Sequence, residues 1–333
     1  MNFLVLGGGT WGVTLAWLLT GNGHQARVWE FDPQVVAELD RTRRHPRLPH
    51  LELPGTLSIT GDMGEGLAGA EAIVCAVPAA HVRETCETLA SAGYGDRWFV
   101  ICSKGIEQGT HALLSDVVAE TLGSATDGRI GVLSGPSHAE EVSRGVPTAV
   151  TATAPDLALA ERIRDWFMAP RFRVYTQTDM IGVELAAALK NVIAIACGIG
   201  DGLGFGDNSK AALMTRGLSE IVRLGVAMGA KQETFFGLAG IGDLAVTCMS
   251  RHSRNRNFGA FMGEGATAAE ALDKVGMVVE GYFTVRAAVE LARMHGVEMP
   301  ISEGVAAIVF EGVKPAEAVS ALMMREAKSE MES

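Results

Sequence analysis

"NFLVLGGGTWGVTLAWLLT", residues 2–20, decides the fold. A short apolar run leads directly into Gly7, Gly9 and Gly12, and a stretch with helical spacing follows, which indicates a strand, a glycine turn and a helix. In the spacing G-x-G-x-x-G the first glycine allows the tight turn, the second lets a pyrophosphate approach the backbone, and the third permits close helix packing. The helix N-terminus adds amides and a positive dipole end. The segment therefore predicts a dinucleotide-binding unit at the start of the chain.

The same alternation continues to about residue 177. Further β-rich runs occur at 25–30, 71–77, 98–102, 128–135, 148–153 and 172–177. Stretches with helical spacing occur between them at 11–20, 78–91, 110–122 and 156–168. Strands that alternate with helices predict βαβ connections and a mostly parallel, doubly wound sheet. We expect an α/β, Rossmann-type domain over residues 1–178.

The strand pattern stops near Asp179. "DMIGVELAAALKNVIAIACGIG", residues 179–200, has helical spacing, and Asp179 is suited to cap it. Helices are expected beyond it at 207–229, 255–263, 267–273, 281–295, 300–311 and 315–323. We expect an all-α C-terminal domain over residues 179–333, joined to the first domain by a helix rather than by a flexible linker.

Composition limits the function. A chain of 333 residues is longer than one core usually serves, and a net charge of -11 argues against nucleic acid or an anionic membrane as the main partner. Met1 leads straight into a strand, which leaves no room for a signal peptide, and no window reaches about 18 uninterrupted apolar residues. We expect a cytoplasmic protein without a membrane span.

The cysteines and histidines suggest no metal site. The five cysteines are scattered, without a C-x-x-C pair, and the eight histidines show no H-x-x-x-H or H-E-x-x-H spacing. We interpret the cysteines as reduced core residues: Cys75, Cys86, Cys102, Cys197 and Cys248.

The end of the second predicted strand bears on the choice of dinucleotide. "VWEFD" places Glu30 eighteen residues after Gly12, where an acidic side chain accepts hydrogen bonds from the adenosine ribose and disfavours a 2′-phosphate. Arg41, Arg43 and Arg44 follow and could contact such a phosphate, although a solvated basic face is the simpler interpretation. The cofactor is therefore NAD or NADP.

Several polar residues stand where strand or helix ends should converge. Lys190 and Asn191 interrupt an apolar helix, and burying an unpaired ammonium is costly. Lys104 directly follows a predicted strand, at the end where open α/β sheets bind ligands. "LSGPSHAEE", residues 133–141, is a turn that opens a helix and suits an anion.

A basic cluster runs against the charge of the chain. Arg251, His252, Arg254 and Arg256 lie within six residues. Arginine side chains suit a phosphate dianion. A solvated basic helix face is the alternative.

Together these stretches resemble the NAD(P)-dependent glycerol-3-phosphate dehydrogenases. The matching segments, in family order over residues 2–310, are "GGGTWG", "SKGIE", "GPSHAEEV…PTAV", the block at 184–220, "GLAGIGDLAVTC", "SRNRNFG" and "VVEGYFT". The block at 184–220 and "SRNRNFG" are far more specific than the glycine pattern.

The resemblance implies an enzyme that interconverts sn-glycerol 3-phosphate and dihydroxyacetone phosphate by hydride transfer and supplies glycerol phosphate for phospholipid synthesis. It implies a cytosolic homodimer whose C-terminal domain binds substrate. Lys190 would be the proton donor and acceptor, with a pKa lowered by its apolar helix and a second cation such as Lys104. As hypotheses, Lys104 would polarise the carbonyl, and Asp243 would orient Lys190 or a substrate hydroxyl.

The resemblance also implies two sets of contacts. The substrate positions are Lys104, Gly135, Ser137, Lys190, Asp243, Ser253, Arg254 and Asn255. The cofactor positions are Gly7, Gly9, Thr10, Trp11, Gly12, Glu30, Phe31, Lys104, Ala139, Arg254, Val278 and Glu280.

The chain departs from the family at Phe31, where many relatives carry Arg or His. The loss of that cation beside Glu30 favours NAD and leaves NADP open. Two alternatives remain: a related 3-hydroxyacid or 6-phosphogluconate dehydrogenase, and a non-catalytic nicotinamide sensor. The order of "GIGDL" and "SRNRNFG" favours the glycerol phosphate enzyme.

Overall fold

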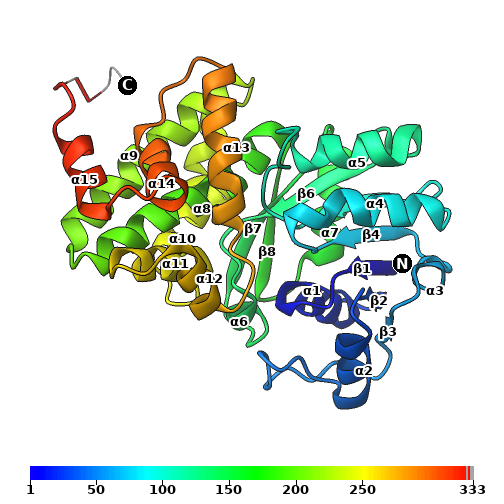
Figure 1. Cartoon of the computed structure of the whole chain (residues 1–333). Helices are drawn as coiled ribbons and strands as arrows, with labels where there is room; N and C mark the ends of the chain where they lie inside the picture. Colours follow the sequence, from blue (N-terminus) through cyan, green and yellow to red (C-terminus); the bar gives the residue numbers. More distant parts are fainter. Residues whose placement is uncertain (328, 331–333) are drawn as a thin grey trace. The chain divides into compact units, whose positions relative to one another are not determined.

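The chain forms two compact units in a computed structural model that describes residues 1–327 and 329–330. The first unit comprises Met1–Lys104 and Leu113–Met180; the second comprises Gly105–Ala112 and the chain from Ile181 onward. Figure 1 shows the elements of each unit in chain order. The transition lies close to the expected residue 178. The sequence pattern did not indicate that the short segment 105–112 would belong to the second unit.

The first unit is built on one sheet. Its strands are β1 (Asn2–Leu6), β2 (Gln25–Trp29), β3 (Ser58–Thr60), β4 (Ala72–Cys75), β5 (Trp98–Ile101), β6 (Ile130–Ser134), β7 (Thr148–Thr153) and β8 (Phe172–Gln177). In the described part of the chain they form an eight-stranded sheet in the order β3-β2-β1-β4-β5-β6-β7-β8. Neighbours are parallel except β6 and β7, which run antiparallel. The predicted doubly wound, mostly parallel sheet is confirmed.

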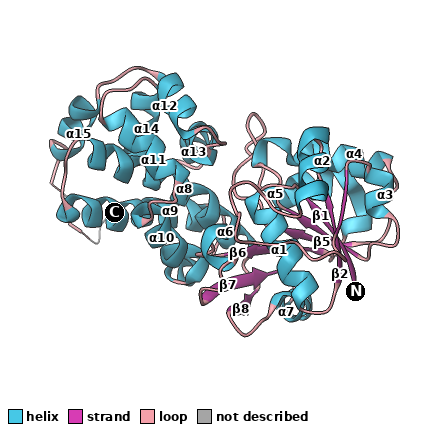
Figure 2. Ribbon diagram, turned by 90° about the horizontal axis from the view of Figure 1, so that it is seen from below, coloured by secondary structure: helices cyan, strands magenta, loops and turns pink. Residues whose placement is uncertain are grey.

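Helices cover both faces of this sheet (Figure 2). They are α1 (Thr10–Gly21), α2 (Pro33–Thr42), α3 (Met63–Leu67), α4 (Val82–Ser91), α5 (Leu114–Leu122), α6 (Ala139–Val142) and α7 (Leu157–Phe167). Helices α1 and α7 share a core with the strand residues Phe3, Val5 and Val74. Side chains alternate along a strand, so the intervening strand residues face the other side, where α4 and α5 pack on each other. The helix expected over 110–122 begins only at Leu114.

The second unit is helical. It contains α8 (Met180–Gly202), α9 (Asp207–Ala227), η3 (Gln232–Phe236), η4 (Leu238–Gly242), α10 (Asp243–Met249), α11 (Arg254–Gly263), α12 (Ala268–Val275), α13 (Glu280–Met294), α14 (Pro300–Phe310) and α15 (Pro315–Met323). Helix α8 is long and apolar enough to cross a bilayer, but 89% of its apolar 18-residue stretch is buried inside the fold. Buried core helices satisfy the same criterion, and α8 is the central helix of this unit.

Helices α8 and α11 touch backbone to backbone. Gly198 and Gly202 on α8, and Gly259 and Gly263 on α11, repeat the spacing G-x-x-x-G on both sides of the contact. A Cβ atom at Gly198 would lie 2.8 Å from the carbonyl carbon of Arg256 and closer still to its oxygen. Only glycine permits this approach, so the start of α11 is held at a fixed place on α8.

The five cysteines are free and buried, which confirms that they are core residues. Burial raises the pKa of the Cys75 thiol to about 11. A thiol held in its protonated form is a poor nucleophile, so Cys75 is suited to packing rather than to covalent chemistry.

Candidate active site

The glycine turn leaves room for a phosphate at the start of α1. Gly7 has φ 103°, and its amide donates to Trp29 O at 2.8 Å, which joins the turn to β2. A Cβ atom at Gly12 would collide with Gly7 O, whereas one at Gly9 would meet nothing within 4 Å. Helix α1 starts at Thr10, and no side chain caps its first amides. This open turn fits the pyrophosphate of a dinucleotide.

Glu30 is hydrogen-bonded to the backbone of that turn. Its Oε2 accepts from the amide of Gly8 at 2.7 Å, and its Oε1 accepts from the amide of Asp32 at 3.1 Å. The residue is buried, yet each carboxylate oxygen has a second lone pair that could still accept from a ribose hydroxyl. The neighbouring Phe31 is 77% exposed, so an aromatic face stands beside the predicted adenosine position.

Two of the three downstream arginines have local partners. Arg43 Nη2 donates to the backbone oxygens of Pro54 and Leu57, and Arg44 pairs with Glu52 at 2.5 Å. These contacts anchor the loop after α2. Arg43 and Arg44 were expected to lie on a solvated basic face, but both side chains bond within the protein.

The carboxyl ends of β5 and β6 bring together three of the predicted substrate residues. Lys104 Nζ donates to Gly135 O at 3.1 Å, and Ser137 Oγ donates to the same oxygen at 3.2 Å. Gly135 has φ 149°, and a Cβ atom there would lie 2.9 Å from Val150 Cα, so only glycine fits. Ala139 follows at the start of α6. One cation and one hydroxyl therefore converge at this edge of the sheet.

In the second unit, Lys190 is buried but paired. Its Nζ donates to Asp243 Oδ1 at 2.6 Å and to Thr247 Oγ1 at 2.7 Å, and all three residues are at most 5% exposed. Thr247 Oγ1 in turn donates to Asp243 O at 2.6 Å. Segment η4 precedes Asp243 and is kinked at Gly240, which has φ -91° and ψ -108°. The pairing explains how an apolar helix accommodates an ammonium. Lys104 lies in the first unit, so its predicted effect on Lys190 stays a prediction.

A buried amide chain lies next to this group. Asn255 Nδ2 donates to Asn191 Oδ1 at 2.9 Å, and Asn255 Oδ1 accepts from the amide of Gly281 at 2.8 Å. Both ends of the Asn255 side-chain amide bond inside the protein, and its expected contact with substrate stays a prediction. It ties the start of α11 to α8 and to α13, which begins at the predicted cofactor residue Glu280.

The arginines of the basic cluster differ in burial and in their partners. Arg256 Nη2 lies 2.6 Å from Asp201, whose other oxygen is 2.7 Å from Lys210. Arg254 is exposed and donates to Val278 O at 2.9 Å. Ser253 caps α11 by accepting from the amide of Arg256. Arg254 is therefore better placed than Arg256 to meet a ligand phosphate at the start of α11.

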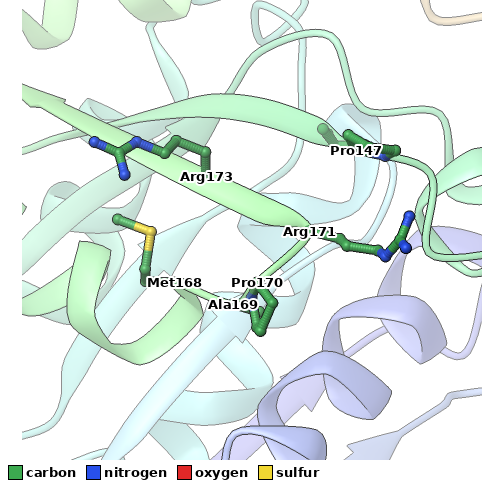
Figure 3. Close-up of a pocket in the computed structure, with 7 residues that line it drawn as sticks. Pro147, Met168, Ala169, Pro170, Arg171 and Arg173 are labelled. Carbon is green, nitrogen blue, oxygen red and sulfur yellow. The ribbon is translucent and has the colours of Figure 1, made fainter.

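A hollow of about 490 Å³ lies at the start of β7 and β8 (Figure 3). Among the described residues, its lining includes none of the predicted site residues. Arg171 and Arg173 extend away from each other, so they offer no convergent charge (Figure 3). This hollow lacks the chemistry of the two groups described above.

Thr247 was not predicted, and Asn191 was singled out in the sequence without a role in the site. Thr247 could have been found from its spacing, since it lies four residues after Asp243 and so shares a helix face with it. Asn191 stands next to Lys190 in an apolar helix, and the cost of burying an unpaired amide is the signal that it has a partner.

Two family models cover nearly the whole chain. The N-terminal model of the NAD-dependent glycerol-3-phosphate dehydrogenases matches residues 2–160, and the C-terminal model matches residues 179–320. A protein of Lysinibacillus sphaericus named glycerol-3-phosphate dehydrogenase [NAD(P)+] is 49% identical over 98% of this chain and 97% of its own length. One of the same name from Clostridium perfringens is 46% identical over 98% of both chains.

Solved structures agree. A glycerol-3-phosphate dehydrogenase from Coxiella burnetii is 38% identical and superposes with a TM-score of 0.92, over 97% of this chain and 99% of that one. A D-mandelate dehydrogenase, at 13% identity and a TM-score of 0.65 over 96% of this chain and 99% of that one, shares the fold alone. The chain belongs to the family of NAD-dependent glycerol-3-phosphate dehydrogenases.

Proposed function

We propose that this chain interconverts glycerol 3-phosphate and dihydroxyacetone phosphate with NAD or NADP, and that Lys190 handles the proton. The observation that carries the proposal is the buried contact between Lys190 Nζ and Asp243 Oδ1 at 2.6 Å. Reduction of a ketone requires a proton at oxygen as hydride arrives at carbon, and oxidation requires the reverse. Bound NADH or NADPH supplies that hydride.

Asp243 and Thr247 orient the ammonium. An ammonium has three donors, and two of them point to Asp243 Oδ1 and Thr247 Oγ1. These two bonds fix the rotation about the Cε–Nζ bond and hence the direction of the third N–H. The Asp243 carboxylate stabilises the Lys190 ammonium until Lys190 releases a proton to the substrate oxygen.

The substrate phosphate belongs at the start of α11. Arg254 supplies a guanidinium there, and the helix N-terminus supplies a positive dipole end. Asn255 and Ser253 hold that turn in place through their own bonds. Lys104 and Ser137, on the sheet edge, polarise the carbonyl and orient the substrate.

The dinucleotide belongs to the glycine turn. Gly7, Gly9, Thr10, Trp11 and Gly12 would hold the pyrophosphate. The adenosine would lie against Glu30 and Phe31, and the predicted contacts toward the nicotinamide are Lys104, Ala139, Arg254, Val278 and Glu280. Without a cation at position 31 and with Arg43 and Arg44 engaged, we favour NAD over NADP.

We further propose that residues 1–178 serve as the dinucleotide-binding domain and residues 179–333 as the substrate-binding and catalytic domain. The family resemblance supports a cytoplasmic homodimer that supplies glycerol phosphate for phospholipid synthesis. Light scattering tests the dimer, because a mass near 35.1 kDa in solution would identify a monomer instead.

The decisive experiment follows the absorbance of NADH and, in parallel, of NADPH during reduction of dihydroxyacetone phosphate. Lys190→Met should lose hydride transfer while nicotinamide binding, measured by fluorescence, stays close to wild type. Lys314→Met is the control, since Lys314 is 81% exposed and pairs only loosely with Glu317 at 3.8 Å. Normal turnover by the Lys190 variant would refute the assignment of Lys190 as the residue that handles the proton.

A further inference from the structure

Residues 105–112, which we call the strap, leave the first unit and return to it. The strap starts directly after Lys104 and ends before Leu113, both of which belong to the first unit, while the strap itself packs within the second. Ile106 is 3% exposed, so the strap is anchored by a buried side chain rather than draped over the surface.

Two polar contacts fasten the strap to α13. His111 Nε2 lies 2.5 Å from Glu290 Oε2, and Gln108 Nε2 donates to Phe283 O at 3.3 Å. An ionised carboxylate can only accept, so the imidazole N–H donates. Phe283 and Glu290 are seven residues apart, which is about two turns along one face of the helix.

The strap is also closed on itself. The amide of Glu107 donates to Ala112 O at 3.0 Å, the amide of His111 donates to Glu107 O at 3.1 Å, and Thr110 Oγ1 donates to Glu107 Oε2 at 2.5 Å. These bonds close residues 107–112 into a compact loop. Only Gly105 and Ile106 separate that loop from Lys104.

The backbone of His111 is unusual. It has φ 62°, in the left-handed region that a residue other than glycine rarely occupies. Such conformations persist where the surroundings over-determine them and cluster at functional sites. Here the surroundings are the Glu290 carboxylate and the Glu107 carbonyl.

We propose that the strap positions Lys104 and that His111, held by Glu290, is its anchoring residue. This inference rests on the role proposed above for Lys104. Helix α13 begins at Glu280, and its Gly281 amide is bound to Asn255. The same helix thus binds the start of α11 at Gly281 and the strap at Phe283 and Glu290, two and nine residues further on. His111 is a positioning residue, because it acts through Lys104.

The test is a kinetic double-mutant cycle. His111→Ala removes the imidazole and should lower kcat about tenfold, less than the roughly hundredfold cost of a 1 Å misplacement, with unchanged nicotinamide binding. His111→Gln keeps an amide donor on the same left-handed backbone and should recover most of the loss. His81→Ala is the control, because His81 sits on an exposed helix face, 3.7 Å from Glu84.

The cycle is completed with Lys104→Gln and the double variant. Turnover is measured with enzyme in excess, so that slow variants remain measurable. If the strap acts through Lys104, His111→Ala has no further effect in the Lys104→Gln background. If His111→Ala lowered turnover by the same factor in the wild-type and Lys104→Gln backgrounds, or did not lower it in the wild type, the inference would be overturned. Full activity of Lys104→Gln alone would instead refute the proposed role of Lys104.

Discussion

The glycine contact between α8 and α11 can be tested with one methyl group. Gly198→Ala would place a Cβ atom 2.8 Å from Arg256 C and 2.9 Å from Ala260 N, whereas ordinary contacts begin at 3.4 Å. Both neighbours are backbone atoms of a packed helix. The start of α11 must therefore move by at least 0.6 Å, the difference between 3.4 Å and 2.8 Å, and further to clear the Arg256 oxygen.

The expected cost has two parts. Overpacking of this kind costs about 1–3 kcal/mol, and the better helix propensity of alanine returns up to about 1 kcal/mol. A net loss of about 1–2 kcal/mol lowers Tm by about 2–4 °C for each kcal/mol. Because the displaced turn carries Arg254, kcat/KM for dihydroxyacetone phosphate should fall by about 10- to 100-fold.

Gly200→Ala is the matched control. It lies two residues away on the same helix, but its added Cβ would meet only side chains, the nearest being Phe205 Cδ2 at 3.6 Å. We expect unchanged or slightly higher stability and normal kinetics. Thermal unfolding and steady-state assays on both variants suffice. If Gly198→Ala matched Gly200→Ala in Tm and in kcat/KM, the close helix contact would not position the phosphate site.

Three further predictions concern single residues. Arg254→Ala should raise KM for dihydroxyacetone phosphate by at least tenfold, with little change in kcat, as expected for the loss of a charge-assisted bond of about 1.5–3 kcal/mol; an unchanged KM in steady-state assays would favour Arg251. Phe31→Arg should shift the ratio of kcat/KM for NADPH over NADH upward by about tenfold, and an unchanged ratio would show that position 31 does not meet the 2′-phosphate. Burial raises the pKa of Glu220 from 4.5 to about 7, so the folded protein binds this proton more tightly than the unfolded chain does. The stability that results from this difference is complete below pH 4.5 and is lost as pH rises through 7. Urea unfolding should show that the free energy of unfolding falls by an amount on the order of 3 kcal/mol between pH 4.5 and pH values above 7. The Glu220→Gln variant should lack this fall, and identical pH profiles for the variant and the wild type would contradict the prediction.

Local sequence patterns predicted most of the sheet. Strands such as β1 and β4 are continuous apolar runs, which is typical of strands buried on both faces. Strand β3 was missed because it spans only Ser58–Thr60, too short for a periodic signal. The antiparallel pairing of β6 with β7 was not predicted either. Strand direction depends on contacts between distant segments and leaves no mark on the local spacing.

The candidate site was predicted in part. Lys190 was singled out because an ammonium in an apolar helix needs a partner, and the family resemblance pointed to Asp243, which the structure brings to 2.6 Å from it. Helix α10 was missed because the glycines before Asp243 obscure its start, and Thr247 was missed with it. The strap was missed because residues 110–122 match helical spacing, although His111 has a left-handed backbone.

The strap has a consequence for synthesis on the ribosome. His111 and Glu290 are 179 residues apart in the chain. At roughly 5–20 residues per second, Glu290 is made about 10–40 s after His111. The sheet around Lys104 can fold during that interval, but its strap has no helix to bind until α13 emerges. We expect the nascent chain to acquire its dinucleotide turn early and its aligned Lys104 only near the end of translation.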